Sequence, residues 1–128
     1  MFVRFVEHRI DNASGVRRGI FHAVSDLRRS MAVARHDARR LTDILIWFGA
    51  NLKEPARFSR SRRPHRQAQA ISWFKTGAAE HLAKIREAQT ILESYGCVIE
   101  MITTRRPGYI VYEDEYQVAA YPFNDTAT

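Results

Sequence analysis

Residues 97–120 have the sequence CVIEMITTRRPGYIVYEDEYQVAA. Three apolar runs, rich in β-branched and aromatic residues, are separated here by two short polar stretches. The first, 105–108, contains proline and glycine in the positions that suit a β-turn, and the second, 113–115, consists of acidic residues. Short runs of this composition joined by tight turns are typical of antiparallel strands. The stretch therefore predicts a meander with strands at 97–104, 109–112 and 116–120.

An amphipathic helix is predicted directly before this meander. Between Gly77 and Gly96 apolar residues recur at intervals of three and four, the period of one helical face: Ala79, Leu82, Ile85, Ala88 and Leu92. Gly96 stands where a helix commonly ends in left-handed backbone. We expect the apolar stripe of this helix to cover one face of the sheet.

The first half of the chain predicts one strand and two further helices. Residues 2–10 interleave apolar and charged side chains, as strands do. A helix capped by Ser14 is then predicted from a stripe with helical spacing: Val16, Ile20, Val24, Leu27 and Met31. Another helix is predicted to begin at Asp37 and to end near Gly49. The short apolar run 70–74 fits a buried strand or the end of a helix, and we favour the strand.

Together these elements predict an α+β fold. Its mainly antiparallel sheet has four to five strands, from the N-terminal strand and the C-terminal β-meander, and about three helices cover it. A chain of 128 residues that is 45% hydrophobic is large enough for one core. We expect a single domain over 1–123 and a frayed tail at 124–128. Because Cys97 is the one cysteine and no apolar run has membrane-spanning length, we expect a soluble, cytoplasmic protein with no membrane partner.

Charge is distributed unevenly along the chain. Residues 1–75 hold 16 Lys and Arg against 6 Asp and Glu, a net charge of +10, whereas residues 76–128 hold 4 against 8, a net charge of −4. No acidic residue occurs between Glu54 and Glu80. The connection 52–68, which lacks any apolar period, contains a cluster of arginines: Arg57, Arg60, Arg62, Arg63 and Arg66. Such an uncompensated cluster is typical of a surface that meets an anion.

The first functional hypothesis is a binding domain without catalytic activity. The five clustered arginines, assisted by Lys75 and by Arg105 and Arg106 in the predicted turn, are expected to bind a polyanion, with nucleic acid as the first candidate. The planar guanidinium group suits this role because it can donate two hydrogen bonds to one phosphate. The sequence contains no helix-turn-helix, ribonucleoprotein motif, KH loop or zinc finger that would define a specific target. A solvated loop, an acidic protein partner and self-association remain open alternatives.

A second hypothesis is a small enzyme that acts on an anionic, phosphate-bearing or nucleotide substrate. Arginines would orient the phosphate, and His8 or a carboxylate of Glu113–Glu115 would act as acid or base. This hypothesis requires that these groups converge on one pocket. The histidines lack metal-binding spacing, and Cys97 is expected to be buried and inert, so we expect no metal and no cofactor.

Overall fold

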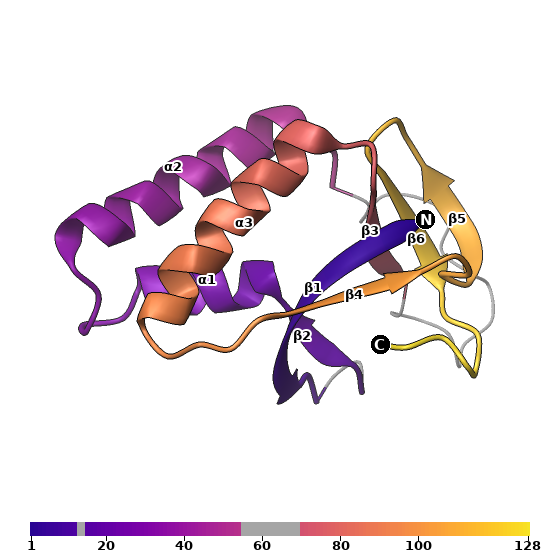
Figure 1. Cartoon of the computed structure of the whole chain (residues 1–128), viewed down its shortest axis with the longest axis horizontal. Helices are drawn as coiled ribbons and strands as arrows, with labels where there is room; N and C mark the ends of the chain where they lie inside the picture. Colours follow the sequence, from indigo (N-terminus) through magenta and orange to yellow (C-terminus); the bar gives the residue numbers. More distant parts are fainter. Residues whose placement is uncertain (13–14, 55–69) are drawn as a thin grey trace.

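The computed structural model of the protein describes residues 1–12, 15–54 and 70–128. It shows an α+β fold, as predicted, in which three helices lie beside an antiparallel sheet (Figure 1). The strands are β1 (Phe2–Ile10), β2 (Arg17–Gly19), β3 (Ile71–Lys75), β4 (Glu100–Thr104), β5 (Tyr109–Glu113) and β6 (Gln117–Tyr121). The helices are α1 (Ile20–Arg28), α2 (Arg35–Asn51) and α3 (Ala79–Ser94). The sheet has six strands because β2 adds to those expected.

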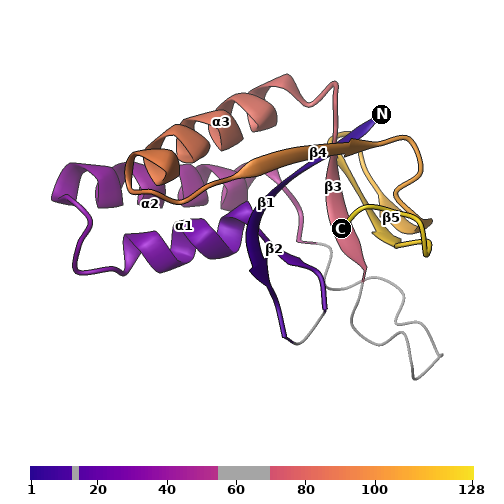
Figure 2. The same ribbon diagram turned by 60° about the horizontal axis from the view of Figure 1, so that its bottom comes forward.

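Strand β1 divides the sheet. The strand order is β2-β1-β3-β6-β5, and β4 pairs with β1 outside this path. Val6 pairs with Gly19 of β2 and with Glu100 of β4, so these two strands lie on opposite edges of β1. Strand β3 pairs with β1 only at Phe2 and Val3. It therefore shares an edge of β1 with β2, and the two strands diverge in a fork (Figure 2).

Apolar side chains form one core on each face of the sheet. Successive strand residues point to opposite faces, so Phe5 and Val6 belong to different cores. The first core joins the sheet to the helices and includes Val3, Phe5, Val24, Leu41, Ile44, Phe74, Ile85 and Leu92. The second comprises Val6, Ile71, Trp73, Ile102 and Val118. Fully burying one such large side chain contributes about 1.5–3 kcal/mol, which makes these cores the main source of stability.

The prediction of a helix from Val16 to Met31 was wrong at both ends. Residues Arg17–Gly19 form β2, so the helix begins at Ile20 and ends at Arg28. Gly15 has φ +73°, and the chain turns there and pairs with β1. Residues 17–19 therefore form a strand, because their backbone pairing with β1 is more favourable than the helix that the spacing of the apolar residues predicts. Met31, which we expected on the buried stripe, lies beyond the helix and is fully exposed. The expected cap, Ser14, lies outside the described residues.

The other predicted elements are present with small shifts. The run 70–74 forms strand β3, and Gly96 ends α3 with φ +84°. Strand β4 begins at Glu100 rather than at Cys97 because the Cys97 N–H donates to the Leu92 carbonyl at 3.0 Å and so still belongs to the helix end. Among the described residues, no helix is long and apolar enough to cross a membrane.

The last residues, for which we expected a frayed tail, make hydrogen bonds with the fold. The carbonyl oxygen of Thr128 accepts hydrogen bonds from the Arg17 N–H at 3.2 Å and from the Arg4 guanidinium at 2.9 Å. The hydroxyl of Thr126 donates to the Arg106 carbonyl at 3.1 Å. The last residue thus lies against β1 and β2.

Candidate functional site

The five clustered arginines lie outside the described residues, so the structure contains no information on Arg57, Arg60, Arg62, Arg63 and Arg66. It does describe the two points at which the chain enters and leaves this arginine segment (residues 55–69). Glu54 follows α2, and Ala70 precedes β3. The contacts that fix the backbone at these two points therefore determine from which part of the fold the segment starts.

A buried histidine holds the end of α2. His81 of α3 is only 4% exposed, and its Nε2 lies 2.8 Å from the carbonyl oxygen of Asn51. Because a carbonyl can only accept, Nε2 carries the proton and donates. The imidazole lies among aromatic rings, at centroid distances of 4.3 Å from Tyr116 and 4.9 Å from Trp47. His81 thus has a structural role at the end of α2.

A buried glutamine holds the chain two residues further on. Gln117 of β6 is 2% exposed, and its Nε2 donates to the Lys53 carbonyl at 2.6 Å and to Asp114 Oδ2 at 3.2 Å. His81 and Gln117 are the buried polar side chains in the described part of the chain. Both are used to fix backbone carbonyls directly before the arginine segment.

We predict that Gln117→Met lowers the free energy of unfolding by about 1–3 kcal/mol, because it leaves the carbonyl of Lys53 without its donor at a buried site. Urea unfolding followed by circular dichroism would measure this. Gln89→Met is the matched control, since the half-buried Gln89 makes a weaker 3.2 Å bond to the Ile99 carbonyl. Equal losses in both variants would contradict an anchoring role for Gln117.

The acidic turn is occupied by structural contacts. The Asp114 carboxylate accepts hydrogen bonds from the Tyr112 hydroxyl at 2.7 Å and from the Tyr116 N–H at 2.8 Å. Burial opposes the charge of this carboxylate, but the hydrogen bonds outweigh it and hold the pKa of Asp114 below its usual value. Glu113 pairs with Lys75 at 2.6 Å. Among residues 1–12, 15–54 and 70–128, no group of three or more His, Cys, Asp or Glu could hold a metal ion.

The three cations expected to assist the arginine segment are dispersed. Lys75 lies at the far end of β3 from Ala70, about 16 Å away along the strand. Arg106 is 3.7 Å from Asp125, and its guanidinium lies 5.0 Å from the centroid of Phe123. Arg105 is exposed and has no ion pair with any described residue. The structure therefore does not gather these side chains at the ends of the segment.

A cleft of about 670 Å³ opens at the fork between β2 and β3. Aromatic side chains make up much of its wall: Phe5, Phe21, Phe48, Trp73 and Phe74. Lys53, Glu54 and Ala70 also line it. Both ends of the arginine segment therefore lie at this cleft. The sequence did not predict the cleft, because it depends on β1 pairing with two diverging strands.

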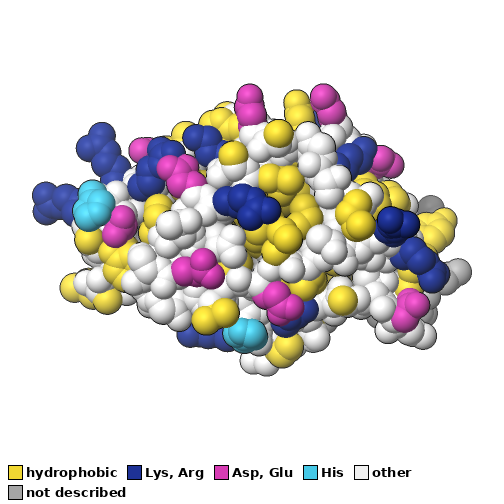
Figure 3. All heavy atoms as spheres, in the orientation of Figure 1, with side chains coloured by type: hydrophobic (Ala, Val, Ile, Leu, Met, Phe, Trp, Pro, Cys, Tyr) yellow, Lys and Arg dark blue, Asp and Glu magenta, His cyan; other side chains and the backbone are white. Residues whose placement is uncertain are grey.

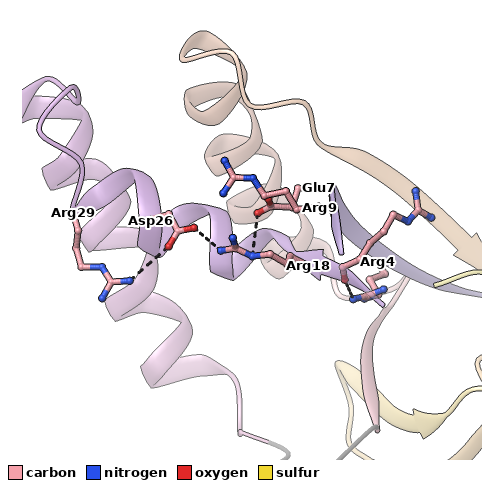
Figure 4. Close-up of polar contacts among 7 residues, drawn as sticks. Arg4, Glu7, Arg9, Arg18, Asp26 and Arg29 are labelled. Carbon is pink, nitrogen blue, oxygen red and sulfur yellow. Dashed lines mark hydrogen bonds and ion pairs between the residues drawn. The ribbon is translucent and has the colours of Figure 1, made fainter. Parts of the chain in front are cut away.

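Most arginines around the cleft are already neutralised within the fold (Figure 4). Arg18 pairs with Asp26 and lies 3.8 Å from Glu7, and Arg29 also contacts Asp26 at 3.7 Å. Arg17 pairs with Glu100 at 2.9 Å.

Arg4 is the exception. Its guanidinium donates to the carbonyl oxygens of Arg17 at 2.7 Å and Thr128 at 2.9 Å, and it pairs with no Asp or Glu side chain of the described residues. Burial, together with the neighbouring charge of Arg17, lowers the pKa of Arg4 to about 10. The guanidinium remains charged at neutral pH.

The groups that the enzyme hypothesis requires do not converge in the described residues. Lys75, which pairs with Glu113, also pairs through its backbone with Phe2 at the start of β1. His8 is exposed towards the other end of this strand, about 20 Å from Phe2. His8 and the acidic turn therefore lie near opposite ends of the sheet.

Comparison with known proteins adds no functional assignment: no protein-family model matches the sequence, and neither does any curated protein or solved structure. The function is therefore inferred from the residues themselves.

Proposed function

We propose that this protein is a binding domain without catalytic activity, which engages a polyanion, with nucleic acid as the first candidate, through the arginine segment. The supporting observation is the distribution of charge. Several described cations have acidic partners within the fold, as Arg17, Arg18 and Lys75 do, and basic and acidic side chains intermingle on the face shown in Figure 3. The sequence from 55 to 79, by contrast, contains no acidic residue at all.

The anchored start of the segment supports the same proposal. His81 and Gln117 fix the carbonyls of Asn51 and Lys53 directly before it. A charged segment that starts from a fixed point meets a ligand on one side of the molecule, so less orientational freedom is lost when it binds. Clustered guanidinium groups would then contact successive phosphates. Such contacts supply affinity but carry little sequence information, which agrees with the lack of a base-reading motif.

Fluorescence anisotropy with short mixed-sequence DNA and RNA, measured over a range of salt concentrations, would test this function. The test variant replaces Arg57, Arg60, Arg62, Arg63 and Arg66 with alanine. If all five contact phosphates, the wild-type slope of log affinity against log salt should be steeper than that of the variant by about 3.5 for single strands and about 4.5 for duplex. We expect the variant to lose at least about 100-fold in affinity at low salt.

Two matched variants make this experiment specific. Changing the exposed α2 residues Arg35 and Arg39 to alanine removes positive charge elsewhere, and should leave most of the binding intact. Replacing the five segment arginines with lysine keeps the charge and should retain the salt dependence. Absence of binding by the wild type at low salt, or full binding by the five-alanine variant, would overturn the proposal.

A further inference from the structure

Two side chains with unused hydrogen-bond donors line the cleft between β2 and β3. The first is the guanidinium of Arg4, which donates to the oxygens of Arg17 and Thr128 and pairs with no Asp or Glu side chain of the described residues. The second is the indole N–H of Trp73, which is buried and makes no hydrogen bond within the described structure. Buried donors are normally satisfied, and an exception calls for a missing acceptor.

The remainder of the cleft is suited to an apolar body. Its walls include Phe5, Phe21, Phe48 and Phe74, and its volume of about 670 Å³ lies within the range typical of small-molecule sites. Lys53 and His22 also line it, as do the carboxylates of Asp11 and Glu54, so the anionic head is placed at Arg4. A bare inorganic ion would leave these aromatic walls unused, and a neutral hydrocarbon would leave the remaining donors of Arg4 unused.

We propose that this cleft binds a small organic anion, whose carboxylate or phosphate head lies at Arg4 and whose apolar body lies against the aromatic walls. Arg4 has five N–H donors, of which two are used in the fold, so the others can bond to the head. The indole N–H of Trp73, which has no acceptor in the described structure, is a second candidate donor to the same ligand. This site goes beyond the polyanion proposal, since none of its donors belongs to the arginine segment.

The test uses the full chain with Trp47→Phe, which leaves Trp73 as the one tryptophan. Decanoate, phenyl phosphate and uridine monophosphate are titrated separately, and tryptophan fluorescence and calorimetry are recorded. We expect saturable 1:1 binding of at least one of them, and the one that binds best identifies an acyl, aryl or nucleotide anion as the ligand. Decanol or uridine, which lack the charge, should bind at least about 10-fold more weakly than the charged counterpart, because the ion pair with Arg4 is lost.

Two variants separate the site from a general effect on folding. Arg4→Met removes the charge and should weaken binding at least about 10-fold. Because Arg4 also bonds two carbonyls of the fold, Ser72→Phe serves as a second variant: Ser72 is exposed and lines the cleft, and a phenyl ring there fills the space without touching the charge. Arg35→Met, on the exposed surface of α2, should bind as the wild type does.

No saturable binding of any charged probe, equal binding of charged and uncharged probes, or unchanged affinity in both cleft variants would overturn the inference. The five-alanine variant of the arginine segment should bind the small probes within about 3-fold of the wild type, a difference below 1 kcal/mol. The cleft proposal and the polyanion proposal therefore fail separately.

Discussion

Replacing Gly108 with alanine is expected to lower the free energy of unfolding by about 3 kcal/mol or more, from backbone strain and overpacking together. Gly108 has φ +131°, a conformation that residues with a Cβ rarely adopt. A Cβ built there would collide with the carbonyl oxygen of Tyr121 and lie 2.8 Å from the Cα of Pro122. Both are backbone atoms, so no side-chain rotation relieves the contact. The start of β5 must then separate from β6 where Tyr109 of β5 pairs with Tyr121 of β6.

Gly49→Ala is the matched control for this experiment. Gly49 lies within α2, and a Cβ there would meet no atom within 4 Å. Alanine is the better helix former, so this change should stabilise the protein by about 0.5–1 kcal/mol. Urea unfolding of both variants would show changes in the free energy of unfolding that have opposite signs. A loss below 1 kcal/mol for Gly108→Ala would show that β5 does not approach β6 in this way.

The parts of the fold that follow local periods could be predicted from the sequence. Helices α2 and α3, strand β1 and the C-terminal meander each carry a pattern of apolar residues and turn residues that favours one structure. Strand β2 could not be predicted, because three residues are too few for a period. Ile20, Val24 and Leu27 do lie on a helix, and Val16 extends their spacing by coincidence into a segment that pairs with β1.

For the candidate site, the sequence predicts which residues are clustered but not which contacts hold them in place. The arginine cluster is visible from the residues, whereas the anchors that precede it depend on contacts between distant segments. A signal for His81 was present: it stands among the buried residues of α3 in a stripe spaced at four, three and four with Ile85, Ala88 and Leu92. A polar residue at a buried helical position must find a partner. Gln117 carries no comparable signal, since it is the first residue of a strand, where a polar side chain is as readily expected at the surface.

Replacing Asp114 with alanine is expected to cost about 3 kcal/mol, because several hydrogen bonds to one charged acceptor are lost together. The donors are the Tyr112 hydroxyl, the backbone N–H groups of Tyr116 and Gln117, and the Gln117 side chain. The loss also removes one of the two bonds that orient the Gln117 side chain towards Lys53. Glu115→Ala is the control: this neighbouring acidic residue is exposed, and its loss should change stability by less than about 0.5 kcal/mol.

The pH dependence of stability distinguishes the contribution of the negative charge of Asp114 from the contribution of its hydrogen-bonding geometry. Hydrogen bonds lower the pKa of this carboxyl in the folded protein, so at acid pH the unfolded chain binds the proton more readily than the folded one. Its contribution to stability is present above the unfolded pKa of about 3.9 and is lost as the pH falls through the lower folded value. Asp114→Asn keeps one acceptor oxygen and removes this titration, so the stability of the variant should fall less steeply with acid than that of the wild type.

A second carboxylate also contributes to the pH dependence. Asp26, whose pKa is also lowered because Arg18 donates a hydrogen bond to it, still titrates in the Asp114→Asn variant and leaves a residual slope of stability against pH. Urea unfolding between pH 7 and pH 3 would measure both slopes, and identical slopes would mean that Asp114 gains nothing from its charge.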